Sequence, residues 1–170
     1  MDMERYIFRR AVATDLPVIE KILKDAVARM LAEGKQQWNE SYPTAVHVLA
    51  DMARDVAFVL ELQGEVVAYG AVVLDGEPAY NDLAGDWLSD QEYVVVHRVA
   101  VSQNAQGRGV GARFLKAVEF YAAGKGIGSF RIDTNFDNFA MLALLEKCGF
   151  AYCGEVMYER GSRKAFEKLI

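Results

Sequence analysis

A strand, a glycine-rich loop and a helix are expected to follow one another between Glu92 and Tyr121. The segment Tyr93–Val101 is rich in β-branched residues and has the length of a buried strand. Five polar or small residues separate it from Gly107, Gly109 and Gly111, which open a stretch with helical apolar spacing. Glycines let backbone N–H groups converge on an anion at the positive end of a helix. The loop therefore predicts a ligand that carries phosphate.

Two common phosphate-binding motifs fit this loop poorly. A nucleotide triphosphate loop needs Lys-Ser or Lys-Thr after its glycines, and neither dipeptide follows here. The dinucleotide pattern G-x-G-x-x-A is met by Gly107–Ala112, with Asp133 as a candidate ribose-binding acid. However, several residues separate Val101 from the first glycine, and the 37 residues after Asp133 (170 minus 133) are too few for the further βα units of a doubly wound fold.

A family resemblance offers a third interpretation. The segment Gln106–Gly111, QGRGVG, resembles the Q/R-x-x-G-x-G/A motif of the GNAT N-acetyltransferase superfamily. The segment Asn138–Phe150, NFAMLALLEKCGF, resembles the N-x-x-A-x-x-L-Y-E-K-x-G-F motif that follows the next strand in that family. One departure from it matters: Leu145 stands where many members have a tyrosine that protonates the departing CoA thiolate.

The resemblance implies an α/β fold of the α+β type, with a mixed, mostly antiparallel sheet of six to seven strands flanked by helices. A splayed parallel pair, Tyr93–Val101 and Phe130–Thr134, would bind CoA. The chain has 170 residues, of which 52% are hydrophobic, which suits one domain over residues 1–170.

The rest of the chain is expected to supply the other elements of such a sheet. Strands are predicted at Tyr6–Arg10, Ala57–Leu62, Val66–Leu74, Ala151–Tyr158 and Lys164–Ile170. Helices are predicted from Thr14 to Gly34, at Thr44–Arg54, from the glycine loop to Gly124 and at Asn138–Cys148. The long acidic connection Asp75–Gln91 is expected to be functional or mobile, with one helical turn around Asn81–Leu88.

Composition excludes several classes of protein. No apolar run approaches the roughly 20 residues of a membrane span, and the first residues do not open a secretory signal, so a soluble, cytoplasmic protein without a membrane partner is expected. Cys148 and Cys153 have no His or Cys at ligand spacing, so no metal site is expected. The net charge of −5 disfavours nucleic-acid binding and favours a cationic partner such as an amine.

The resemblance assigns the cofactor site to the main chain. The backbone amides of the loop would hold the pyrophosphate of acetyl-CoA; the loop comprises Gln106, Gly107, Arg108, Gly109, Val110, Gly111 and Ala112. Val99 and Val101 would bond the pantetheine arm, and an N–H near Val99 or Ala100 would polarise the thioester carbonyl. Asn138, at the start of the next helix, would bond the cofactor arm.

The acceptor amine must lose a proton before it attacks, because a lysine-like amine has a pKa of about 10.4. His97 is the first candidate for the base, since it interrupts a valine-rich strand and histidine is the residue type whose unperturbed pKa lies close to neutral pH. A hydrogen-bonded core histidine remains the alternative. Glu92 and Asp133 are further candidates for the catalytic carboxylate. Trp38 and Tyr42 are either packing residues or contacts to the acceptor.

Three functions remain open at this point. The first is an acetyl-CoA-dependent N-acetyltransferase that acts on a small primary amine, by direct attack in a ternary complex. The second is an N-acetyltransferase for proteins or peptides, and the third is a non-catalytic acyl-CoA sensor. With Leu145 in place of tyrosine, the thiolate leaves without protein help or takes a proton from Tyr152 or Tyr158. The sequence leaves open the acceptor, the physiological role and the oligomeric state, a homodimer being possible.

Overall fold

The computed structural model describes residues 5–170 and has a mixed eight-stranded sheet of order β1-β2-β3-β5-β6-β8-β7-β4. Strands β5 and β6 pair in parallel, and the other pairings with a defined register are antiparallel. The chain forms two compact units. Unit 1 holds the chain up to Val72 together with His97–Leu115, and unit 2 holds Val73–Val96 together with Lys116–Ile170.

Unit 1 contains the N-terminal strands and helices. Its elements are β1 (Tyr6–Arg10), a 3-10 turn η1 (Ala13–Asp15), α1 (Leu16–Ala32), α2 (Ala45–Ala53), β2 (Ala57–Leu62), nearly all of β3 (Glu65–Val73), the second part of β5 (Val94–Val101), η3 (Gln103–Ala105) and the start of α3 (Val110–Gly124). Gly34, with φ +73°, follows the end of α1 as expected, and Thr44 caps α2.

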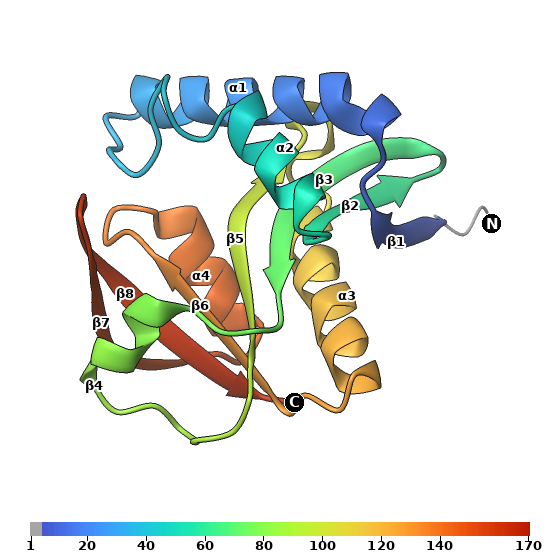
Figure 1. Ribbon diagram of the computed structural model, residues 1–170. Coiled ribbons are helices and arrows are strands. Elements are labelled where there is room, and N and C mark those ends of the chain that lie inside the picture. Colours follow the sequence, from blue (N-terminus) through green and yellow to red (C-terminus); the bar gives the residue numbers. More distant parts are fainter. Residues whose placement is uncertain (1–4) are drawn as a thin grey trace. The chain divides into compact units, whose positions relative to one another are not determined.

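One apolar stripe of α1 forms the core of unit 1. Ile19, Leu23 and Val27 recur at helical spacing and are buried against Val59 and Tyr69 of the sheet. The helix α2 lies beside α1 (Figure 1). The second part of β5 packs in the same core, because Ala100 of β5 belongs to it.

Unit 2 contains the C-terminal part of the sheet and the acidic connection. Its elements are η2 (Pro78–Asp82), β4 (Ala84–Gly85), the first part of β5, most of α3, β6 (Ser129–Thr134), α4 (Phe139–Lys147), β7 (Ala151–Tyr158) and β8 (Gly161–Leu169). The short β4, which pairs with β7, brings the sheet to eight strands rather than the expected six to seven.

The connection before β5 differs from the sequence prediction. A 3-10 turn at Pro78–Asp82 replaces the helical turn expected around Asn81–Leu88. Pro78 favours the first position of a turn of helix, and the Glu77 side chain accepts from Ala79 N, so the turn begins earlier. Gly85 then adopts φ +148° where it closely approaches the backbone of β7, and this contact forms the unexpected strand.

Arg131 and Glu167 fix the same connection to the sheet of unit 2. The Arg131 guanidinium lies 4.2 Å from the ring centres of both Trp87 and Tyr93. Glu167 is fully buried and accepts from Leu88 N at 2.9 Å and Ser89 Oγ at 2.7 Å. A buried carboxylate needs such partners. The connection is therefore held in place by its own contacts.

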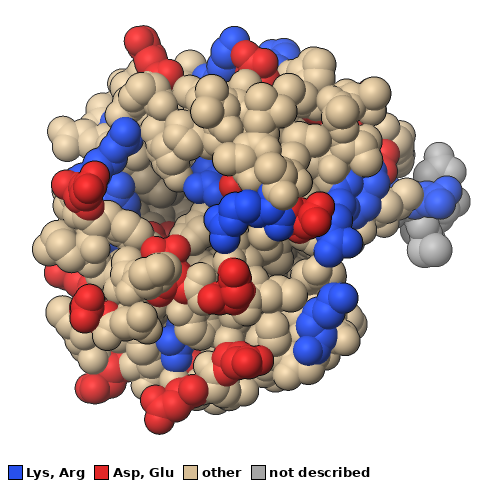
Figure 2. All heavy atoms as spheres, in the orientation of Figure 1, with Lys and Arg blue, Asp and Glu red and all other residues tan. Residues whose placement is uncertain are grey.

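Most acidic side chains of the connection are exposed to solvent. Asp82, Asp86 and Asp90 are exposed, and Figure 2 shows acidic groups over the part of this face that holds β4 and β7. Among residues 5–170, no helix combines the length and the apolar character that crossing a membrane requires.

Candidate functional site

The predicted phosphate loop lies in unit 1, between the end of β5 and the start of α3. Ser102 N donates to Val67 O at 2.7 Å and anchors the loop to β3. The side chain of Gln106 turns back to the strand, where its Nε2 donates to Val101 O at 3.1 Å. The first motif residue thus closes the loop on β5, and α3 begins at Val110, which is buried.

Two glycines give the loop its shape. Gly107 and Gly109 have φ values of +77° and +74°, and no heavy atom lies within 4 Å of the position that a Cβ would occupy at either residue. A left-handed backbone favours glycine, and the open space leaves the main chain accessible to a ligand. Because the helix dipole places positive charge at the start of α3, the loop fits a diphosphate.

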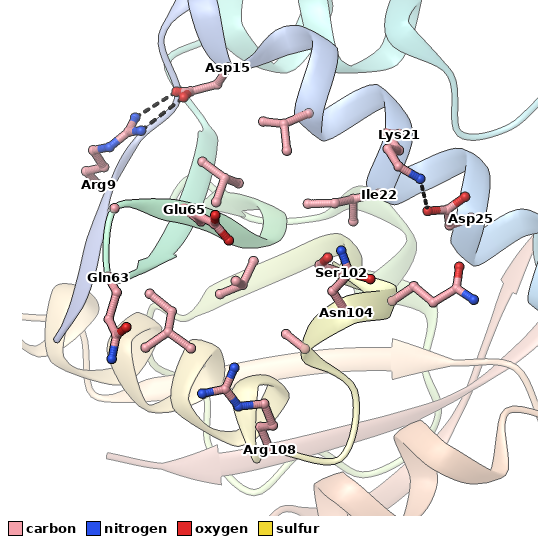
Figure 3. A pocket seen from close by; sticks show the side chains of 17 residues that line it. Arg9, Asp15, Lys21, Ile22, Asp25, Gln63, Glu65, Ser102, Asn104 and Arg108 are labelled. Carbon is pink, nitrogen blue, oxygen red and sulfur yellow. Dashed lines mark hydrogen bonds and ion pairs between the residues drawn. The ribbon is translucent and has the colours of Figure 1, made fainter. Parts of the chain in front are cut away.

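A polar cleft of about 670 Å³ lies beside the loop in unit 1. Figure 3 shows Arg108, Asn104 and Ser102 among the side chains that line it. Two ion pairs also line it: Arg9 donates to Asp15 at 2.7 Å, and Lys21 donates to Asp25 at 2.9 Å (Figure 3). The first pair joins β1 to η1 and the second lies within α1, so both have a structural role.

The middle of β5 carries His97, the first candidate base. It also carries the N–H groups that are predicted to donate to the thioester carbonyl. His97 and Val99 are half-buried, and Ala100 is buried. The carbonyl of Val101 already accepts from Gln106 and, at 3.3 Å, from Arg29 NH2. A ligand contact at Val101 would therefore involve its N–H group.

Arg98, next to His97, has a left-handed backbone with φ +58°. Its guanidinium makes a two-point contact with Asp51 of α2 and donates to the Tyr42 hydroxyl at 3.0 Å. Tyr69 of β3 donates to the same Asp51 carboxylate. Burial, followed by the charge of Asp51, raises the pKa of Tyr69 well above its usual value, so its proton stays in this hydrogen bond.

Asp51 and Tyr69 were not predicted as site residues from the sequence, whereas Tyr42 was predicted as either a packing residue or an acceptor contact. A signal was present, because Asp51 lies three residues after the buried Val48 on the apolar face of a short helix. A carboxylate at such a position requires a buried partner. Trp38, the other predicted acceptor contact, is 5% exposed and belongs to the core of unit 1.

In unit 2, Asp133 of β6 receives two tyrosine hydroxyls on one oxygen. Tyr80 donates to Asp133 Oδ2 at 2.6 Å and Tyr158 donates at 2.9 Å. Burial first, and then the Asp133 charge, raise the pKa of both tyrosines well above the usual value. None of the described residues donates to the second oxygen, Oδ1, in the hydrogen bonds of this carboxylate. Tyr80 was not anticipated, since an aromatic residue in an acidic connection reads as a packing residue.

The register of unit 2 separates the two candidate carboxylates. Val95 pairs with Arg131, so Glu92 precedes this pair by three residues and Asp133 follows it by two. Glu92 lies before the start of β5 at Val94, and Asp133 lies near the end of β6. The two carboxylates therefore lie toward opposite ends of the parallel β5–β6 pairing.

The second family motif forms α4 in unit 2. Asn138 caps this helix, and its Oδ1 accepts from Met141 N at 3.2 Å, so its carbonyl oxygen serves the helix. Leu145 is fully buried and faces the core.

Two cations of α3 have partners of their own: Arg113 stacks on Tyr6 at 4.2 Å, and Lys116 pairs with Glu119 at 3.3 Å.

Known structures share this fold. An acetyltransferase of the GNAT family from Streptococcus agalactiae is 31% identical, with a TM-score of 0.89 and coverage of 97% of this chain and 95% of that one. A ribosomal-protein-alanine N-acetyltransferase from Brucella melitensis is 24% identical (TM-score 0.68; coverage 96% and 99%). A Salmonella typhimurium structure, described as an acetyltransferase with its cofactor acetyl-CoA, is 20% identical (TM-score 0.68; coverage 96% and 93%).

The comparison with curated proteins returned no match. The family model "Acetyltransferase (GNAT) family" matches residues 23–150, a span that includes β5, the glycine loop, β6 and α4. Both motifs therefore lie inside the matched region and on the elements where the family resemblance requires them. The chain belongs to the GNAT acetyltransferase family and is an acyltransferase.

Proposed function

We propose that the protein transfers the acetyl group of acetyl-CoA to a primary amine on a small molecule. The observation that carries this proposal is the turn at the start of α3, where Gly107 and Gly109 hold left-handed backbones with open space around them. Such a turn presents main-chain donors to a diphosphate, and acetyl-CoA, the cofactor in the Salmonella typhimurium structure, carries one.

In this proposal the loop amides of residues 106–112 hold the pyrophosphate, and Arg108 adds positive charge. The main chain at Val99 and Val101 aligns the pantetheine arm, and Asn138 contributes its side-chain amide group. Acetyl-CoA supplies an activated acyl group as a thioester. The N–H groups near Val99 and Ala100 are assigned to the thioester oxygen, where negative charge develops only in the transition state.

The amine nitrogen attacks the thioester carbon directly. A C–N bond forms, the C–S bond breaks, and the electron pair leaves on the CoA sulfur. His97 is assigned to take the proton from the amine, directly or through water. Asp133 is assigned to hold the ammonium form, because Tyr80 and Tyr158 orient one carboxylate oxygen and leave the other for a ligand.

The assignment of a small acceptor is supported by the fixed position of residues 36–43 within unit 1. The buried Trp38 and the hydrogen bond between Tyr42 and Arg98 tie this segment to the unit. A polypeptide acceptor needs an open groove, and a fixed segment of this kind favours a small ligand.

The departing thiolate is assigned no protein acid. Leu145 offers no proton, and the raised pKa of Tyr158 makes its hydroxyl a poor donor of one. A thiol has a pKa of about 8.5, so a thiolate is a tolerable leaving group near neutral pH.

Thiol release from acetyl-CoA tests the proposal. A panel of polyamines, amino acids, aminoglycosides and peptides with N-terminal alanine is added, and amine-dependent release is expected for one small amine. Release with peptides alone would favour protein acetylation, the activity in the name of the Brucella melitensis structure. Tight CoA binding by calorimetry without release across the panel would contradict catalysis. Binding of NAD instead of CoA would reject the cofactor assignment.

Two variants test the roles assigned to His97 and Asp133. His97→Ala is expected to lower kcat/KM by about 10²- to 10⁴-fold and to remove the lower limb of its pH profile. Asp133→Asn is expected to raise KM for the amine with less effect on kcat, because it weakens binding of the charged acceptor. An unchanged pH profile in His97→Ala would exclude this histidine as the base.

The cytoplasmic location and a homodimer remain predictions from the sequence.

A further inference from the structure

Arg98 lies in the middle of β5 with a backbone that an arginine rarely adopts. Its φ of +58° falls in the left-handed region, which costs free energy for any residue with a Cβ. The residues before and after Arg98 in the chain belong to the same strand, since β5 runs from Val94 to Val101. A single left-handed residue rotates the peptide groups that follow it out of the regular strand pattern. The direction of the Val99 and Ala100 N–H groups therefore depends on Arg98.

The side chain of Arg98 is held at three points within unit 1. Its Nε donates to Asp51 Oδ2 at 2.9 Å, its NH2 group donates to Asp51 Oδ1, and its NH1 group donates to Tyr42. The side chains of Arg98 and Asp51 are 14% and 4% exposed. A two-point arginine–carboxylate contact fixes orientation as well as distance.

Tyr69 completes the arrangement from β3. It is fully buried, and its hydroxyl donates to Asp51 Oδ2, the oxygen that Arg98 Nε also contacts. The carboxylate of Asp51 is thus fixed by α2, which carries it, and by Tyr69. Neither residue belongs to the family motifs of this chain, which lie at residues 106–111 and 138–150.

We propose that Asp51 and Tyr69 are positioning residues for acyl transfer: they hold the Arg98 guanidinium, and through it the left-handed main chain that directs the N–H groups of Val99 and Ala100. The proposal rests on the proposed function, in which these N–H groups face the thioester oxygen. It differs from a purely structural role, because a structural ion pair would affect stability and leave the turnover of the folded protein unchanged.

The first test compares Asp51→Asn with wild type at saturating acetyl-CoA and amine, at a temperature where circular dichroism shows both proteins folded. Asp51→Asn keeps the shape of the side chain and removes its charge. We expect kcat to fall by about 10- to 100-fold, somewhat less than the loss of an oxyanion donor, with a smaller change in KM for acetyl-CoA. Tyr69→Phe, which removes one hydroxyl, is expected to show a smaller decrease of the same kind.

A second substitution provides a rescue. In Arg98→Gly/Asp51→Asn, glycine adopts a φ near +58° without the Cβ penalty, and no unpaired guanidinium is left inside unit 1. We expect kcat of the double variant to exceed that of Asp51→Asn by about fivefold or more, since the backbone cost has been removed. A double variant as slow as Asp51→Asn would show that Asp51 acts by some other route, and it would overturn the proposal.

Asp15→Asn is the matched control. Asp15 also makes a two-point contact with an arginine of unit 1, at 2.7 and 3.0 Å from the Arg9 nitrogens, but Arg9 lies in β1 without a left-handed backbone. The control is expected to lower stability and to keep kcat within about twofold of wild type. Equal kcat values for Asp51→Asn and wild type would reduce Asp51 to a structural role and contradict the proposal.

Nuclear magnetic resonance separates this proposal from the proposed function. The backbone amide signals of Val99 and Ala100 are expected to shift in Asp51→Asn and to stay unchanged in Asp15→Asn. These signals are read in the protein without substrate. If the wild-type protein fails to release thiol with any amine, the proposed function fails, while unshifted amides in Asp51→Asn would overturn the positioning role independently.

Discussion

Arg9 and Asp15 join β1 to the turn that precedes α1. Asp15 accepts from Arg9 at two points and from Val12 N at 2.8 Å, and its side chain is 9% exposed. The hydrogen bonds from Arg9, opposed in part by burial, hold the pKa of the Asp15 carboxyl below its ordinary value of 3.8. A carboxylate of this kind links the stability of unit 1 to pH.

The sign of this pH dependence follows from the lowered pKa. The unfolded chain binds a proton at Asp15 more readily than the folded one, so the contribution is fully present above pH 3.8 and is lost as pH falls through the folded-state pKa. The free energy of unfolding, measured by urea titration between pH 6 and pH 3, is expected to fall less steeply in Asp15→Asn than in wild type. Parallel pH curves for the two proteins would contradict the role of Asp15.

Leu145 occupies the position of the family motif at which many members have a tyrosine. It is fully buried in α4, so a tyrosine there must either bury its hydroxyl or displace neighbours. Overpacking of this kind costs about 1–3 kcal/mol. Leu145→Tyr is expected to fold with reduced stability in thermal unfolding and to retain turnover in the thiol-release assay. A many-fold gain in kcat would show that the native enzyme is limited by the missing acid.

At the scale of elements, the glycine loop is the feature that the sequence indicates most directly. Gly109→Val places a β-branched residue at φ +74° and is expected to raise KM for acetyl-CoA by about tenfold or more, because the strained loop no longer presents its amides. Gly34→Val is the matched control. Gly34 has φ +73° and equally open surroundings, but it ends α1.

Both glycine substitutions are expected to lower stability by a similar amount, about 1–2 kcal/mol, since the backbone penalty is the same. Steady-state kinetics and urea denaturation of the two variants separate cofactor binding from folding. An equal KM in Gly109→Val and Gly34→Val would argue against a main-chain phosphate site.

The strands and helices of this chain could largely be predicted from local patterns. The strands at Tyr6–Arg10, Ala57–Leu62 and Ala151–Tyr158 have the expected bounds, and α1 and α2 lie within the predicted helices. The last strand begins at Gly161, three residues before the predicted start, because its pairing with β7 continues through the hairpin to Tyr158. Composition alone does not locate the start of this strand, because the start depends on its pairing with β7.

The candidate site was predicted only where a motif marks it. The glycine loop and the cap of α4 follow from local sequence, because both are formed by neighbours in the chain. Asp51 with Arg98, and Tyr80 with Asp133, are pairs 47 and 53 residues apart. Their meeting depends on how α2 and η2 pack against the strands of their own units, and the left-handed backbone of Arg98 has no sequence signal, since arginine does not favour it.

At the scale of the whole molecule, two elements belong to both compact units. The strand β5 passes from unit 2 to unit 1 between Val96 and His97, and α3 passes from unit 1 to unit 2 between Leu115 and Lys116. A strand or helix that is cut at such a point loses hydrogen bonds on both sides. We therefore expect neither unit to be stable alone and the chain to unfold as a single domain.

The two tryptophans of the chain test this expectation, because Trp38 lies in unit 1 and Trp87 in unit 2. Trp87→Phe leaves a fluorescence probe in unit 1, and Trp38→Phe leaves one in unit 2. Each substitution lowers stability, so the comparison is made within each variant, between tryptophan fluorescence and far-ultraviolet circular dichroism in urea. Coincident midpoints in both variants are expected for a single cooperative transition. A fluorescence midpoint that differs reproducibly from the dichroism midpoint in either variant would show that the units unfold separately, and β5 and α3 would then not couple them.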